Sequence, residues 1–135
     1  MNYEIELFER DGFVAAVLSG VRTPETLIKA AVRATSFCSE RQVKHLLIDL
    51  RDMTGGLDTL ETYEVAGREL PRQEAVRRVL RSAILDRPEN IERIRFFETV
   101  ALNRGLNVRV FADEGLAVEW LLADAGDTAA SRDRG

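Results

Sequence analysis

Hydrophobic and polar residues alternate at the start of the chain. Residues 3–7 read apolar, acidic, apolar, acidic, apolar, which is the period-two pattern of a strand with one solvated face. Asp11-Gly12 is a typical hairpin-turn pair, and the apolar run 13–18 that follows it is typical of a more central strand. We therefore predict that the chain opens with a β-hairpin.

Helical spacing begins after this hairpin. Thr23-Pro24-Glu25 has the features of a helix start: threonine caps the free amides, proline has the φ angle of a helix, and glutamate meets the positive end of the helix dipole. Apolar residues then recur on one face, which predicts a helix over 24–39. The continuous apolar run 45–50 predicts a buried strand, and it stops abruptly at charged residues and glycines.

A second helix is predicted after this strand. Asp58 and Glu61 have the spacing of a capping box, so the helix begins near Thr59. Pro71 ends or kinks it, because a proline inside a helix removes a hydrogen bond and clashes with the preceding turn. Residues 72–80 fit a second helical piece.

The last part of the chain repeats the strand–helix order. The next strand is confined to 82–85, a third helix runs from Pro88 to a glycine cap at Gly105, a strand spans 107–111, and Asp113 caps a final helix. The order β-β-α-β-α-β-α-β-α predicts an α/β fold. We expect a mixed, mainly parallel sheet of four or five strands, covered by about four helices.

Composition and charge narrow the class of protein. With 135 residues, 45% of them apolar, the chain suffices for one domain with a real core, which we assign to residues 1–123. Residues 124–135 are small, polar and unpatterned, and we interpret them as a disordered tail. The net charge of -4 argues against a nucleic-acid or anionic-membrane surface as the main partner.

The single cysteine allows no internal disulfide and no cysteine-based zinc cluster. The first residues lack a secretory apolar segment, and no apolar run approaches the roughly 20 residues that span a bilayer. We therefore expect a cytoplasmic protein that does not span a membrane and that holds no metal or cofactor.

The segment after the central strand is the first place to look for a binding site, because ligands of open α/β sheets bind beyond the carboxyl ends of the strands. Asp49 and Asp52 have the chemistry of an acid–base pair or of metal ligands, and Arg51 between them suits an anion. An ordinary salt-bridged loop is the alternative. Gly55-Gly56 either lets a ligand approach bare backbone or only permits a tight turn.

Apolar side chains near this segment are candidates to line a pocket. They are Met53, Tyr63, Phe96 and Phe97. Plain core packing is the alternative for all of them. Cys38 and His45 have no sequence partners that indicate a catalytic triad, so we predict a binding surface and not an active site.

Four segments carry a resemblance to a known family. They are 46–58 (LLIDLRDMTGGLD), 82–85 (SAIL), 95–98 (RFFE) and 107–122 (NVRVFADEGLAVEWLL). Together they resemble the SpoIIAA-like branch of the STAS superfamily over nearly the whole predicted domain. The resemblance implies a non-enzymatic α/β sandwich. Members of that superfamily bind protein partners, nucleotides or other small ligands, and related folds accommodate lipids.

The same resemblance implies a candidate phosphosite. In anti-sigma-factor antagonists a serine directly after an aspartate, at the start of helix two, is phosphorylated to release a partner kinase. Asp58-Thr59 is the nearest match here, with threonine in place of serine and Leu60-Glu61 where the antagonists have small residues. Helix capping by Asp58 and Thr59 is the alternative.

We infer a non-enzymatic regulatory or small-ligand-binding module that acts through the segment after the central strand and the face of the third helix. The candidate residues are Asp49, Arg51, Asp52, Met53, Thr54, Gly55, Gly56, Asp58, Thr59, Tyr63, Arg95, Phe96 and Phe97. A phosphorylation-switched interaction domain and a carrier of a lipophilic small molecule are the two alternatives. The partner is an unidentified small ligand or protein, and a homodimer through an exposed helix face or the first strand is a further alternative.

Overall fold

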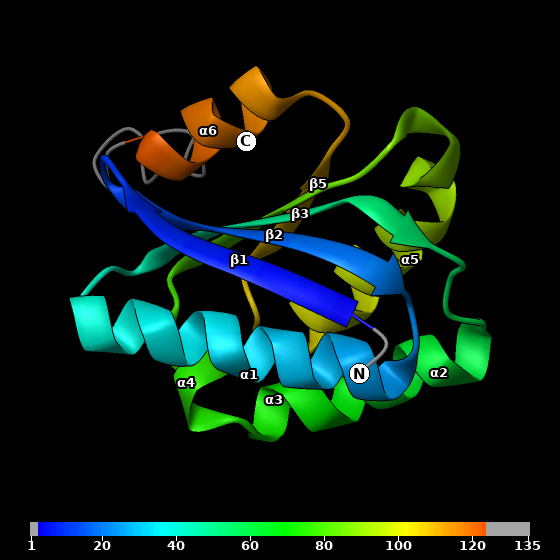
Figure 1. Ribbon diagram of the computed structural model, residues 1–135. Helices are drawn as coiled ribbons and strands as arrows, with labels where there is room; N and C mark the ends of the chain where they lie inside the picture. The colour runs from blue at the N-terminus through cyan, green and yellow to red at the C-terminus, as the bar shows by residue number, and fades with distance from the viewer. Residues whose placement is uncertain (1–2, 124–135) are drawn as a thin grey trace, which may run out of the picture.

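The computed structural model describes residues 3–123, in which one mixed sheet lies between two unequal layers of helices (Figure 1). The strands are β1 (Tyr3–Arg10), β2 (Phe13–Val21), β3 (His45–Thr54), β4 (Arg81–Leu85) and β5 (Val108–Phe111). The helices are α1 (Pro24–Arg41), α2 (Thr59–Glu64), α3 (Leu70–Arg72), α4 (Glu74–Arg78), α5 (Ile91–Asn103) and α6 (Glu114–Leu122), with a π-helical turn at Val65–Glu69 and a 3-10 turn at Pro88–Asn90. The predicted tail, 124–135, lies outside the described residues.

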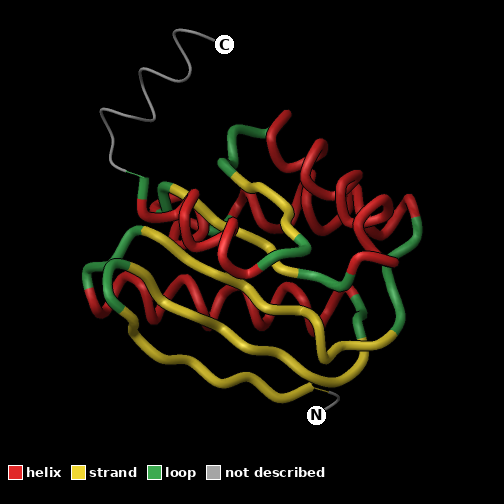
Figure 2. The backbone as a smooth tube through the Cα atoms, turned by 90° about the horizontal axis from the view of Figure 1, so that it is seen from above, coloured by secondary structure: helices red, strands yellow, loops and turns green. Residues whose placement is uncertain are grey.

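The five strands lie side by side in chain order (Figure 2). β1 pairs antiparallel with β2, and the other three pairings are parallel. Helical crossovers connect the parallel strands, because parallel neighbours cannot be joined by a tight turn. The predicted α/β fold with a mixed, mainly parallel sheet is confirmed.

The two faces of the sheet are covered unequally. α1, the segment α2–α4 and α5 lie on one face, and α6 lies on the other (Figure 1). The larger core cluster fills the first face and includes Leu46, Leu50 and Phe97. The smaller cluster packs α6 against the sheet and includes Leu47 and Leu121. Alternate residues of β3 therefore serve two cores, as expected for a central strand.

Local sequence determines both ends of α1. The Thr23 hydroxyl accepts the Thr26 amide at 3.1 Å, and the Thr26 hydroxyl accepts the Thr23 amide at 3.0 Å, so two free donors are satisfied. Gln42 ends the helix in the left-handed conformation, with φ at 58°. The helix therefore extends slightly beyond its predicted end, to Arg41.

The predicted second helix is broken into short pieces. The Leu70 amide bonds to the Val65 carbonyl, which is the pattern of a π-helical turn. Pro71 has no N–H, so the carbonyl of Gly67, four residues earlier, has no helical donor. Arg104, directly after α5, donates its Nε to that carbonyl instead, at 3.0 Å. The helical stretch ends at Arg72, one residue after Pro71, as the prediction that Pro71 ends or kinks the helix allows, and the predicted helical piece after it is α4.

β3 is longer than predicted, because its pairing with β2 continues to Thr54. Val17 pairs with Asp49 and Ser19 pairs with Asp52, so β3 contains one extra residue between these pairs. This extra residue is a β-bulge, which bends a strand and changes the direction of the side chains after it. The last four residues of β3 therefore belong to the sheet and not to the loop that we predicted.

Candidate functional site

The bulge in β3 sends the predicted site residues to opposite sides of the sheet. Arg51 contacts Glu114 on the α6 side. Met53 is fully buried in the larger core cluster, on the α1 side. Without the bulge, these two residues would share one face, because side chains two positions apart in a regular strand point the same way. Met53 is thus a core residue and not part of a binding surface.

Asp49 and Arg51 form an ion pair that ties β3 to the start of α6. Arg51 donates to the Asp49 carboxylate from Nε at 3.0 Å and from Nη2 at 2.8 Å, and Nη2 also donates to Glu114 at 3.1 Å. The hydrogen bond to Asp49 is the main reason why the pKa of Arg51 is raised. Asp52 lies apart from this group, exposed and paired in register with Ser19. The salt-bridged alternative therefore describes Asp49 and Arg51.

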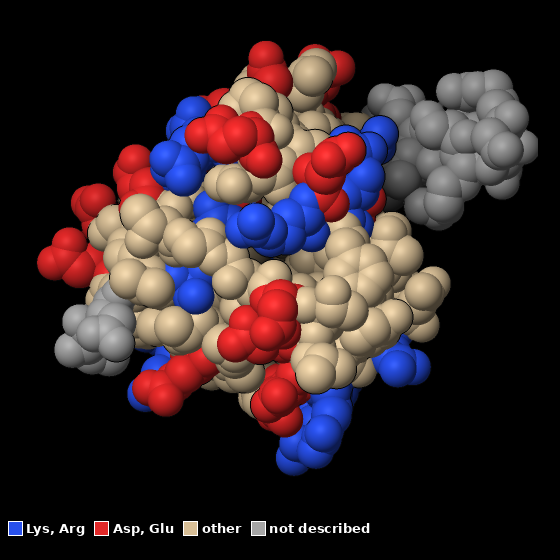
Figure 3. Space-filling model, turned by 90° about the vertical axis from the view of Figure 1, so that its right-hand side faces the viewer, with Lys and Arg blue, Asp and Glu red and all other residues tan. Residues whose placement is uncertain are grey.

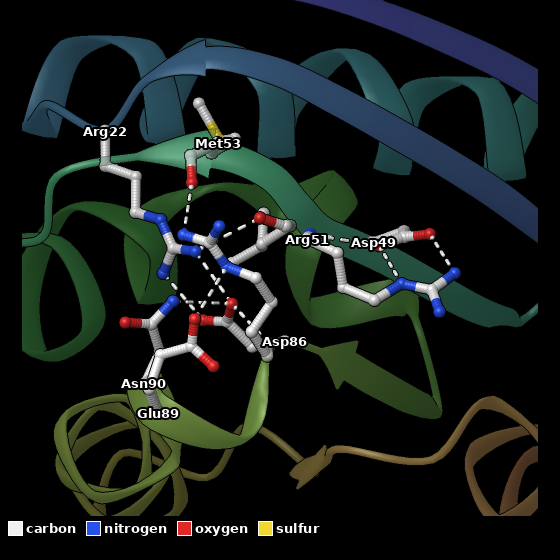
Figure 4. A network of polar contacts seen from close by, with 9 residues as sticks. Arg22, Asp49, Arg51, Met53, Asp86, Glu89 and Asn90 are labelled. Carbon is white, nitrogen blue, oxygen red and sulfur yellow. Dashed lines mark hydrogen bonds and ion pairs between the residues drawn. The ribbon is translucent and has the colours of Figure 1, made fainter.

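A buried ion pair that we did not predict lies under the same segment (Figure 4). Arg22, directly after β2, donates two hydrogen bonds to Asp86, directly after β4, at 2.6 and 2.7 Å. Arg22 also donates to the Leu50 carbonyl at 3.1 Å. The side chains of Arg22 and Asp86 are only 4% and 0% exposed. The pair therefore clamps the ends of β2 and β4 across β3.

Asp86 has further partners at the start of the next helical segment. Its Oδ1 accepts the Arg87 amide at 2.8 Å and the Asn90 side-chain amide at 3.1 Å. Burial by itself raises the pKa of Asp86, but the hydrogen bonds from Arg22, Asn90 and the Arg87 amide outweigh it and hold that pKa below its usual value. Asp86 is therefore a charged structural anchor.

Backbone contacts extend this clamp to the end of β3. The Arg22 amide donates to the Thr54 carbonyl at 2.9 Å. On the other side, the Arg87 guanidinium donates to the Met53 carbonyl at 3.5 Å (Figure 4). The segment that leads from β3 into α2 is thus fixed at its base by the connections on both sides of it.

The two glycines between β3 and α2 have separate structural roles. Gly55 has a φ of 77°, a conformation that residues with side chains rarely adopt. Gly56 lies against Arg93 of α5, whose guanidinium occupies the space that a Cβ atom would need. The tight-turn interpretation explains Gly55. Gly56 does allow a close approach to bare backbone, but the group that approaches it is Arg93 of the same chain.

The predicted capping box of α2 is present. Asp58 accepts the Glu61 amide at 2.8 Å, and the Glu61 carboxylate accepts the Asp58 amide at 2.9 Å. Thr59 is the first residue of α2 and is exposed, as is Thr54 at the end of β3. The Thr59 hydroxyl is therefore accessible at a helix N-terminus, next to the two capping carboxylates.

Apolar side chains gather on α2 and α5 next to Thr59. Leu60 is 79% exposed and Tyr63 is 50% exposed. The Tyr63 ring meets the Phe96 ring of α5 edge-on, with the ring centroids 5.3 Å apart. We call Thr59, Leu60, Tyr63 and Phe96 the α2–α5 face. Figure 3 views the molecule from its right-hand side in Figure 1 and shows uncharged surface between separate acidic and basic groups.

The remaining predicted residues of α5 have different surroundings. Arg95 is exposed, whereas Phe97 is buried in the larger core cluster. The α2–α5 face therefore unites Thr59, Tyr63 and Phe96 from our candidates and adds Leu60, which we did not select.

A separate apolar cavity of about 70 Å³ lies inside the larger core, between α1, α5 and the sheet. Small side chains leave this space open. The alanines that border it are Ala16, Ala30, Ala31, Ala34 and Ala101. Of the four apolar residues that we predicted to line a pocket, Phe97 borders this cavity, and Met53, Tyr63 and Phe96 do not.

Two residues with catalytic potential occupy structural positions. Cys38 is buried in the larger core, and burial raises the pKa of its thiol to about 11, so the reactive thiolate is disfavoured. Burial and the nearby charge of Arg81 lower the pKa of His45. Within residues 3–123, His, Cys, Asp and Glu side chains form no group of three or more that could hold a metal ion.

Two solved structures resemble this chain in fold. One is an anti-sigma factor antagonist from Mycobacterium paratuberculosis, with 16% sequence identity and a TM-score of 0.54 over 90% of this chain and 95% of that one. The other is an uncharacterised protein of the DUF3478 family with a SpoIIAA-like fold from Shewanella loihica PV-4, with 19% identity and a TM-score of 0.51 over 89% of this chain and 93% of that one. No family model and no curated protein sequence matches the chain.

The fold is SpoIIAA-like. The resemblance that we inferred from the strand and loop segments is thereby confirmed at the level of the fold. In this chain the α2–α5 face follows the carboxyl end of the central strand β3. None of the helices within residues 3–123 combines the length and the apolar character that crossing a membrane requires.

Proposed function

We propose that this SpoIIAA-like protein is a non-catalytic regulatory module that binds a protein partner through the α2–α5 face. One observation carries the proposal. Leu60 and Tyr63 project into solvent from a short capped helix, while the strand end beneath them is fixed by a buried ion pair. Large apolar residues that are exposed together are typical of interaction sites, whereas single scattered ones are not.

The chemistry of this face suits a protein partner. Tyrosine is enriched at the energetic centres of protein interfaces, because it offers a large ring and a hydroxyl with few torsions to order. The edge-on contact with Phe96 holds the Tyr63 ring before a partner arrives, which lowers the entropy cost of binding. One of the structural neighbours is an anti-sigma factor antagonist, a name that describes action on another protein.

We propose further that phosphorylation of Thr59 switches this contact off. The Thr59 hydroxyl is exposed and directly precedes Leu60. A phosphate there adds roughly two negative charges beside Asp58 and Glu61, the two residues of the capping box. Like charges weaken the cap, and a partner that covers Leu60 has to desolvate the phosphate. We therefore also propose a cytoplasmic location, where a protein kinase has access to ATP.

Site-specific photo-crosslinking in the native host tests the partner face. A benzophenone amino acid replaces Leu60, and in the matched control it replaces Leu116 of α6, which is 56% exposed. We expect one protein to crosslink at position 60 and not at position 116. Tyr63→Ala and Thr59→Glu lower the yield severalfold, and Thr59→Ala lowers it less than Thr59→Glu, because it adds no charge. The same products at both positions would contradict the proposal.

The apolar cavity favours a second function, the binding of a small lipophilic molecule. Apolar cavities in protein cores stay dry and accept apolar ligands. The volume of about 70 Å³ limits the ligand to a short hydrocarbon segment. Native mass spectrometry of protein from its own host tests this function. Ala34→Leu fills the cavity and removes the bound mass, whereas Ala112→Leu, at an exposed position, retains it. Wild-type protein without any bound mass would contradict this second function.

A further inference from the structure

The two edges of the sheet are protected differently. β5, at one edge, is four residues long, and Glu98 of α5 accepts its Val110 amide at 2.7 Å. β1, at the other edge, is eight residues long and pairs with β2 without interruption from Tyr3 to Arg10 (Figure 2). Short strands and blocked amides prevent an edge from pairing with other chains, whereas a long regular edge invites such pairing.

We propose that β1 pairs antiparallel with β1 of a second copy of this chain, about a two-fold axis at Leu7. The two sheets then form one continuous sheet, and main-chain hydrogen bonds supply much of the affinity. In this register Leu7 lies opposite Leu7 of the second copy, and Glu4 lies opposite the second copy's Arg10. Opposed residues on antiparallel strands have Cβ atoms about 4.5–5.5 Å apart, which is close enough for this ion pair to form.

The charges on β1 favour this register over the other registers that have a two-fold axis at a residue of the strand. A two-fold axis at Glu6 places the two Glu6 side chains opposite each other, and an axis at Ile5 places Glu4 opposite Glu6. Both registers bring like charges together, which destabilises the pairing. An axis at Phe8 also opposes unlike charges, Glu6 and Arg10, but it shortens the paired segment. Among the registers that oppose unlike charges, the axis at Leu7 therefore gives the longest ladder, with two ion pairs.

The charged groups that this register needs are exposed, although Arg10 already has one ion-pair partner in its own chain, Glu114 of α6, at 3.7 Å. Glu4, Glu6, Phe8 and Arg10 share one face of β1, because alternate residues of a strand point the same way. Glu4 is exposed, and the Arg10 side chain keeps 44% of its surface exposed. Within the described chain, α6 packs against β3, β4 and β5, on the same side of the sheet. Within residues 3–123 the main contacts of β1 are with β2 and α1, so its outer edge is open to a second copy.

Charge exchange tests the proposal, with native mass spectrometry and light scattering over concentrations from about 1 to 200 μM, a range suited to small interfaces. We expect a concentration-dependent dimer of the wild type. Glu4→Arg and Arg10→Glu are each monomeric, because like charges then face each other. An equal mixture of the two variants restores a dimer, since the arginines of one copy face the glutamates of the other.

Arg109→Glu is the matched control for Arg10→Glu. Arg10 stacks on Phe13 at 5.1 Å, and Arg109 stacks on Phe111 of β5 at 5.6 Å, so both variants remove a cation–π contact at opposite edges. Arg10→Glu also removes the ion pair with Glu114. Arg109→Glu should leave the dimer intact, and thermal unfolding shows whether each variant folds.

A wild type that stays monomeric at every concentration overturns the proposal. So do single variants that dimerise like the wild type, or mixed variants that fail to associate. β1 and the α2–α5 face are separate surfaces, so none of these outcomes bears on the proposed partner contact.

Discussion

Two regions meet near the carboxyl end of the sheet, and they use charge and apolar surface in opposite ways. Arg22 and Asp86 are charged and buried, and they form two hydrogen bonds with each other. Leu60 and Tyr63 carry large apolar groups and are exposed. Most proteins keep charges outside and large apolar groups inside. The buried charges of Arg22 and Asp86 fix the end of the sheet. The exposed apolar groups of Leu60 and Tyr63 are available for a partner.

The stability of the protein and the binding of its partner should therefore depend on different residues. Removal of one partner of a buried ion pair is costly, because the other charge is left uncompensated in the interior. Substitutions on an exposed face usually change stability little. Variants of the buried pair should therefore change the free energy of unfolding much more than variants of the exposed face. Variants of the exposed face should have the larger effect on partner binding.

The largest effect is expected for Asp86→Ala. The variant leaves the Arg22 guanidinium buried without its counter-charge, and we expect a loss of about 3–5 kcal/mol in the free energy of unfolding. Urea denaturation followed by circular dichroism measures this loss. Asp52→Ala removes an exposed carboxylate from the same segment and serves as the control. Equal losses for the two variants would show that the buried pair is not the anchor that we describe.

The same pair should make stability depend on pH. The pKa of Asp86 is held below its usual value in the folded state, so the unfolded state binds the proton more readily. The stabilisation is present above the unfolded-state pKa of about 3.9 and is lost as pH falls through the folded-state pKa. Unfolding free energies measured from neutral to acidic pH should fall more steeply for the wild type than for Asp86→Asn. Parallel curves would rule this linkage out.

An intermediate effect is expected for Asp58→Ala, which removes the cap beneath the exposed face. The loss should be about 1 kcal/mol in the free energy of unfolding. Asp113 caps α6 in the same way, accepting the Leu116 amide at 3.0 Å, so Asp113→Ala is the matched control. We expect similar losses of stability for both variants, but reduced partner crosslinking for Asp58→Ala alone. Reduced crosslinking in both variants would point to a general loss of stability.

Features with local causes could be predicted from the sequence. Asp58 and Glu61 form the capping box that their spacing indicated, and the helical stretch ends one residue after Pro71, which lacks an N–H. The alternation of strands and helices likewise gave the mixed, mainly parallel sheet, since connection rules leave few topologies for this order of elements.

Features that depend on distant parts of the chain could not be predicted. The bulge in β3 exists only relative to β2, and it is the bulge that makes Met53 a core residue. Arg22 and Asp86 are 64 positions apart in the chain. Each directly follows an apolar strand, which was a usable signal, but Arg51 fits the same description and pairs elsewhere.

The smallest effect on stability is expected for Leu60→Asp. The side chain is mostly in solvent, so the free energy of unfolding should change by no more than about 0.5 kcal/mol. Thermal and urea unfolding of the variant beside the wild type measure this change. A loss comparable to that of Asp58→Ala would mean that Leu60 packs against the protein itself.

The most direct test of the partner face is the affinity of the crosslinked partner, once purified, for three proteins: the wild type, Leu60→Asp and Leu116→Asp. Isothermal titration calorimetry provides it. We predict that Leu60→Asp weakens binding by about tenfold or more, which corresponds to at least 1.4 kcal/mol. Leu116→Asp should bind like the wild type. Equal affinities for all three proteins would contradict the assignment of partner binding to the α2–α5 face.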